Sequence, residues 1–74
     1  MFLSDMKVGE KAKVLSLENP KKIKTRLENV GVTSGVKVTL IRKAPLGDPI
    51  EIKVRDFYLA LRIADAKKIQ VDLV

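Results

Sequence analysis

The sequence predicts a mainly β fold, a small five-stranded barrel with one helix after the first strand. Short segments in which apolar and polar residues alternate recur between turn residues, which is typical of strands with one buried face. One segment, residues 19–31, has apolar residues at helical spacing instead. In a chain of 74 residues, strands gain a shared core and shorter exposed edges by curling into a barrel. We therefore expect a single domain that covers residues 1–74.

The first expected strand covers residues 11–17. Its alternation is imperfect, and we expect Ala12, Val14 and Ser16 on one side of it. The segment predicts a strand at the start of the sheet.

A helix is expected between the first and second strands. Asn19 is a good N-cap, and Pro20 fits the first helical position, where its missing N–H costs nothing. Gly31 adopts the left-handed conformation that often ends a helix without a steric penalty. We interpret this helix as a lid on the sheet, with one apolar stripe formed by Ile23, Leu27 and Val30.

The next two strands follow with short connections. A turn at residues 33–35 precedes a strand over residues 36–41. A loop over residues 43–48 then leads into residues 50–55, which show the clearest alternation in the chain.

The last elements are a hairpin, a helical turn and a final strand. Arg55 and Asp56 are expected to turn into the strand over residues 57–61, with Asp56 taking the place of Gly where φ must be positive. A single helical turn at residues 64–67 and a strand over residues 69–73 complete the chain. The position of the main helix favours an SH3-like barrel, because the OB-fold, the nearest alternative, usually has its helix between strands three and four.

The charge favours acidic partners. The chain has 15 Lys and Arg against 9 Asp and Glu, which gives a net charge of +6 at pH 7. The basic residues are spread along the chain, and three aromatic residues are few for a protein that stacks the bases of a single strand. We interpret the charge as a solvated basic surface. No apolar run is long enough for a membrane span or a signal peptide.

The composition also bears on chemistry. Histidine and cysteine are both absent, so the chain has no familiar site for iron, zinc or copper and no nucleophile–base pair that uses them. We expect neither an enzyme nor a resident metal. The absence of cysteine is consistent with a reducing compartment.

The most distinctive segment is the run Ala44–Val54, followed by Leu59–Arg62. Pro45 and Pro49 restrict the loop in this run and push the residues before them toward extended geometry. Leu46, at the loop tip, allows two interpretations: an apolar anchor for a partner, or a side chain that folds back on the core.

Arg62 follows the fourth expected strand. We expect it to pair with Asp48 or Glu51 and so to pin the loop.

These residues resemble the FeoA family, ferrous-iron transport protein A, over nearly the whole chain. Asp56 stands where the family commonly has Gly. The matching segments are Leu3–Gly9, Arg26–Val32 with Ser34–Gly35, Ala44–Ile50, and Leu59–Arg62 with Ala66, Ile69 and Val71.

The resemblance implies a cytoplasmic, stand-alone accessory protein of ferrous-iron uptake. Such a protein acts by contact with ferrous-iron transport protein B, a membrane permease with a cytoplasmic GTP-binding domain, and so lies at the membrane through its partner. The residues expected at this contact are Lys43, Pro45, Leu46, Asp48 and Arg62.

Two other functions stay open. One is a small basic barrel that binds RNA, although the motif run favours the contact with the permease and no nucleic acid is expected. The other is a domain that senses a divalent metal, since weak binding of Fe²⁺ or Mn²⁺ is implied by the resemblance only. Exposed strand edges also allow a homodimer.

Overall fold

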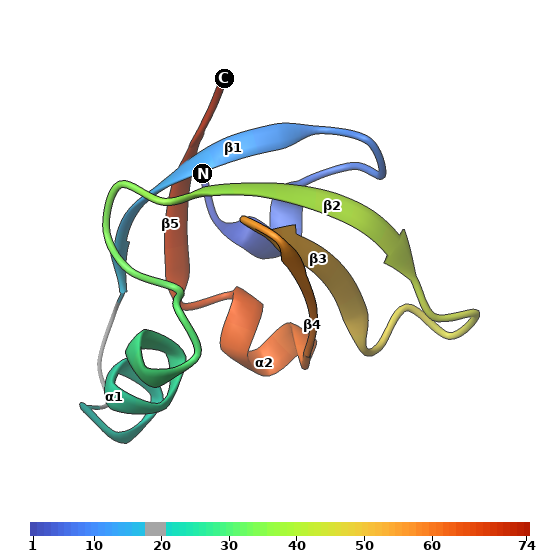
Figure 1. Cartoon of the computed structure of the whole chain (residues 1–74). Coiled ribbons are helices and arrows are strands. Elements are labelled where there is room, and N and C mark those ends of the chain that lie inside the picture. The colour runs from blue at the N-terminus through green and yellow to red at the C-terminus, as the bar shows by residue number, and fades with distance from the viewer. Residues whose placement is uncertain (18–20) are drawn as a thin grey trace.

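The structure is a computed structural model that describes residues 1–17 and 21–74 (Figure 1). The expected helix start at Asn19 and Pro20 lies outside the described residues. The elements are the 3₁₀ turn η1 (Leu3–Asp5), β1 (Lys11–Leu17), α1 (Lys21–Asn29), β2 (Lys37–Lys43), β3 (Ile50–Val54), β4 (Phe57–Leu61), α2 (Ile63–Ala66) and β5 (Ile69–Leu73).

The five strands form one antiparallel sheet in the order β4-β3-β2-β1-β5. This confirms the mainly β prediction and the place of the main helix between the first two strands. The sheet is strongly curved, and α2 connects its two outer strands (Figure 1). In the described part of the chain β4 and β5 do not pair with each other, so the barrel is not closed by hydrogen bonds on that side.

The core lies inside the curved sheet, and every strand contributes to it. Leu3 and Met6 enter it from the N-terminal segment, which the strand pattern alone does not indicate. From the strands and helices come Ala12, Val14, Leu27, Val38, Leu40, Ile50, Ile52, Val54, Leu61, Ala66, Ile69 and Val71.

A β-bulge explains why the first strand alternates imperfectly. The register of β1 against β5 shifts between Val14 and Ser16. One extra residue in a strand moves the following side chains to the opposite face. Ser16 is therefore exposed, contrary to the expected inner position, and Leu17 packs against the core.

Helix α1 ends as predicted at Gly31. The N–H of Gly31 bonds the Glu28 carbonyl at 3.0 Å, and the N–H of Val32 bonds the Leu27 carbonyl at 2.8 Å. This pair of bonds is a Schellman motif, and Gly31 has the positive φ, 97°, that the motif requires. Leu27 is buried, but Val30 is exposed, so the expected apolar stripe does not extend to the helix end.

The hairpin between β3 and β4 turns as expected at Arg55 and Asp56, where Val54 pairs with Phe57. The positive φ falls on Arg55, at 54°, rather than on Asp56 as expected.

The two outer edges of the sheet differ. Phe2 forms an isolated bridge with Gln70, and the Val71 N–H bonds the Met1 carbonyl at 2.8 Å, so the N-terminal residues cover part of the β5 edge. In the described residues no further strand pairs with β4, which leaves that edge open. Across residues 1–17 and 21–74, none of the helices has the length and apolar character needed to cross a membrane.

Replacing Gly31 by Ala should destabilise the fold by more than the same change at Gly35. Both glycines have positive φ, 97° and 90°, which costs a residue with a Cβ about 1–2 kcal/mol. At Gly31 the new Cβ would also lie 3.3 Å from the Phe57 ring, whereas at Gly35 it would meet nothing within 4 Å. Urea unfolding of G31A and G35A measures the difference, and equal losses would show that the Phe57 contact contributes nothing.

Candidate partner-contact site

The loop between β2 and β3 is held by its own backbone. The Ala44 N–H bonds the Pro49 carbonyl at 2.9 Å, and the Gly47 N–H bonds the Ala44 carbonyl at 2.7 Å. The second bond closes a β-turn with Pro45 and Leu46 at its centre, a position that favours proline because its φ is already restricted. Gly47 follows with φ of 88°, and the Asp48–Pro49 peptide is cis. The two backbone hydrogen bonds thus restrain the path of the loop.

Leu46 at the tip of this loop is 97% exposed. The side chain does not fold back on the core, which excludes one of the two interpretations that the sequence left open, whereas its role as an anchor for a partner stays a prediction. A large apolar side chain in this position contributes nothing to the core of the isolated chain. It is free to be buried by a partner.

Asp48 ties the loop to α2. Its Oδ1 accepts a hydrogen bond from the Ile63 N–H at 2.9 Å. The first N–H groups of a helix have no acceptor within the helix, and the residue at the N-cap of α2, Arg62, forms no side-chain cap bond. The carboxylate of a distant loop residue thus supplies the cap that the local sequence lacks.

The expectation that Arg62 pins the loop is wrong. Asp48 bonds the Ile63 N–H instead, and Glu51 pairs with Arg42, whose Nε lies 3.2 Å from the Glu51 Oε1. Glu51 lies opposite Arg42 in the register of β3 against β2, so the sheet itself brings this pair together.

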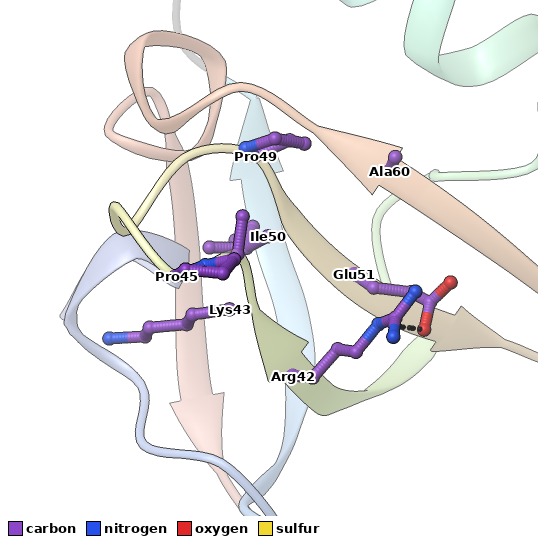
Figure 2. A pocket seen from close by; sticks show the side chains of 8 residues that line it. Arg42, Lys43, Pro45, Pro49, Ile50, Glu51 and Ala60 are labelled. Atoms are coloured by element: carbon purple, nitrogen blue, oxygen red, sulfur yellow. Dashed lines mark ion pairs between the residues drawn. The ribbon is translucent and has the colours of Figure 1, made fainter.

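A shallow cavity of about 240 Å³ lies beside the loop. Lys43 and Pro45 line it, and Lys43 extends away from the Arg42–Glu51 ion pair (Figure 2). The remaining lining residues are Ala44, Pro49, Ile50 and Ala60. Apolar proline, alanine and isoleucine side chains thus share the lining with the charged groups of Arg42, Lys43 and Glu51.

Arg62 lines a second cavity, of about 290 Å³, between α1, β4 and α2. Arg26 and Asp65 form an ion pair at this cavity. Its other lining residues are Leu27, Val30, Leu59, Ala60 and Leu61. Ala60 of β4 lines both cavities.

The structure therefore divides the five predicted contact residues. Lys43 and Pro45 line one cavity, and Leu46 extends into solvent at the loop tip. Asp48 holds the loop, and Arg62 lines the second cavity. Sequence reasoning missed Ala60, which lines both cavities. The apolar fourth strand signalled a buried element, and only the register shows that Ala60 lies opposite Glu51.

A strongly curved, five-stranded antiparallel sheet of this size defines a small, partly open β-barrel domain. Comparison with known proteins makes the assignment specific. The model of the FeoA domain matches residues 1–73, and the chain belongs to this family. The resemblance stated from the sequence is thereby confirmed.

Solved structures share the fold over nearly the whole chain. The solution structure of the FeoA protein from Chlorobium tepidum is 36% identical, with a TM-score of 0.95 over 100% of this chain and 70% of that one. FeoA from Stenotrophomonas maltophilia, described as a procaryotic SH3 domain protein and complexed with zinc, is 33% identical, with a TM-score of 0.86 over 97% of this chain and 89% of that one. The SH3-like prediction is confirmed.

A curated relative is much longer. The Fe(2+) transport protein A/Fe(2+) transporter FeoB fusion protein of Porphyromonas gingivalis is 32% identical over 74 residues, which is 100% of this chain and 9% of the relative.

Replacing Asp48 by Ala should loosen the loop over residues 44–49. The variant loses the bond to the Ile63 N–H, which leaves the start of α2 uncapped and costs about 1 kcal/mol of stability. Backbone ¹⁵N relaxation should show increased motion in the loop. The matched variant Arg62→Ala should leave loop order unchanged, and greater loop motion in that variant would restore the pinning role first expected for Arg62.

Proposed function

We propose that this chain is an accessory protein of ferrous-iron transport that acts by binding the Fe²⁺ transporter FeoB. The observation that carries the proposal is the Porphyromonas gingivalis relative, in which an FeoA sequence and an FeoB transporter belong to one polypeptide. Fusion holds two domains at a high effective concentration, which promotes binding between them. A fused pair is therefore expected to consist of domains that bind each other. The cytoplasmic GTP-binding domain of the transporter is the proposed target, so the proposed location is the cytoplasm.

The loop tip supports a binding role. Leu46 is almost fully exposed, and the backbone bonds around it hold the loop in one shape before any partner arrives. A preorganised loop loses little conformational entropy on docking, so more of the apolar burial appears as affinity. Lys43 and the Arg42–Glu51 pair lie beside it as a charged rim, which is the usual arrangement around an apolar anchor.

The proposed role is regulatory rather than catalytic. The side chain most often used as a general base is His and a particularly strong nucleophile is Cys, and the chain contains neither. Both cavities are shallow, and most of their lining residues are apolar. Such surfaces are compatible with contact to another protein.

We also propose that the chain has no resident metal. Without His or Cys only oxygen ligands remain, and residues 1–17 and 21–74 contain no group of three acidic side chains placed to hold an ion. Titration with Fe²⁺ and with Mn²⁺, followed by NMR, should show only weak and diffuse changes. Saturation of a defined set of residues at micromolar metal would contradict this expectation and favour the metal-sensing alternative.

Replacing Leu46 by Ser should weaken binding to the GTP-binding domain of the transporter from the same organism about tenfold or more, the loss typical of a central apolar anchor. The fold should be unaffected, because this side chain is 97% exposed. Calorimetry with the purified domain measures the affinity.

The matched control is Val8→Ser, which removes another exposed apolar side chain, 59% exposed, from the loop before β1. It should leave the affinity within about twofold, as expected for a residue outside the interface. Equal losses in the two variants, or no binding by the wild-type chain, would contradict the proposed contact.

A further inference from the structure

The register of the sheet gathers lysines that are far apart in the sequence. Ala12 of β1, Val38 of β2 and Val54 of β3 are opposite one another and buried. Successive side chains of a strand point to opposite faces, so the residues next to these three point away from the core. The outer face of the sheet is therefore determined by the same pairing that builds the core.

Two rows of residues on this outer face are rich in lysine. In one row Lys13 is directly opposite Lys37. In the next row Lys11 is opposite Thr39, and Thr39 is opposite Lys53. The four lysines are exposed and come from three neighbouring strands (Figure 1). We call Lys11, Lys13, Lys37 and Lys53 the basic sheet face.

Acidic groups compensate this face only in part. Asp72 of β5 is opposite Lys13, and Glu51 of β3 is engaged by Arg42 in an ion pair. Like charges directly opposite each other on a sheet destabilise it, so the Lys13–Lys37 pair is unfavourable for the isolated fold. An anionic surface laid against the face removes this repulsion.

Tyr58 extends the same face. It is opposite Lys53 in β4, 58% exposed, and the Lys53 ammonium lies 5.9 Å from the centre of its ring. A tyrosine beside lysines is typical of the interface between water and lipid, where the ring sits at the level of the headgroups. A protein that binds single-stranded nucleic acid usually stacks successive bases on several aromatic rings. Phe57, the neighbouring aromatic residue, lies near Gly31 at the end of α1 instead.

We propose that the basic sheet face binds the anionic surface of a phospholipid membrane. This inference goes beyond contact with a transporter, because it gives the chain a membrane contact of its own. The lysine cluster is an observation that does not depend on the proposed function. The choice of a membrane over RNA rests partly on the proposed function, since the proposed partner lies in a membrane.

The expected binding is weak and additive. Each lysine close to an anionic leaflet strengthens membrane binding about fivefold, and the attraction falls off within about 10 Å at moderate salt. A face with four lysines therefore concentrates the chain at the membrane without anchoring it permanently. Contact with a membrane-bound partner would then become an encounter on a surface, with a raised effective concentration.

Vesicle flotation with the full chain tests this proposal. We expect binding to vesicles of phosphatidylcholine with about one third phosphatidylglycerol, little binding to pure phosphatidylcholine, and release by salt as the attraction is screened. The double variant Lys13→Gln/Lys37→Gln should bind about 25-fold more weakly, two fivefold steps. Its thermal stability should equal or exceed that of the wild-type chain, because the variant removes the opposed charges.

The matched control is Lys67→Gln/Lys68→Gln, which removes the same net charge beyond the end of α2. It should keep most of the vesicle binding. Equal losses in both double variants, or no binding to anionic vesicles at low salt, would overturn the proposal. Tighter binding to an unstructured RNA oligonucleotide than to the vesicles at equal salt would overturn the assignment to lipid.

A lipid-free binding assay with the GTP-binding domain separates this proposal from the proposed function. The Lys13→Gln/Lys37→Gln variant should bind that domain as the wild-type chain does, whereas the Leu46→Ser variant should still bind vesicles. Loss of both activities in either variant would contradict the assignment of two separate surfaces.

Discussion

The alternation of side chains along β1, β2 and β3 is the constraint on which the rest of the molecule depends. The buried row of Ala12, Val38 and Val54 sets the register of the three strands. A slip of one residue would turn that row outward and force lysines into the core, at a cost that no surface contact offsets. The core therefore specifies the outer face as strictly as it specifies the inner one.

The loop between β2 and β3 depends on the sheet in a different way. Its shape comes from a turn centred on Pro45 and Leu46, and its position comes from the bond between the Asp48 carboxylate and the Ile63 N–H. One polar group thus caps α2 and orients the loop at the same time. The result is an apolar side chain held in solvent by a rigid support, which would lose little conformational entropy if a partner buried it.

Much of the fold was predictable from the sequence. Period-two alternation and turn residues located β1, β4 and β5 with the bounds that the structure has, and Gly31 indicated the end of α1 correctly. Two of the failures share one cause: they depend on contacts between distant segments. The bulge after Val14 exposes Ser16, and the need of α2 for a cap determines the partner of Asp48. Likewise, the basic residues are scattered along the sequence, and only the cross-strand register brings Lys13 and Lys37 together.

The unequal edges of the sheet have a consequence for how copies of the chain can associate. A strand edge with unpaired N–H and C=O groups is a template for another strand, and two free edges on one molecule allow growth without limit. Here Met1 and Phe2 occupy part of the β5 edge, and β4 is the open one. Main-chain pairing of β4 with the β4 of a second copy uses up the open edge of both molecules. Met1 and Phe2 leave less of the β5 edge for a further strand, so such a pair of copies would offer fewer sites for continued growth than a sheet with two bare edges.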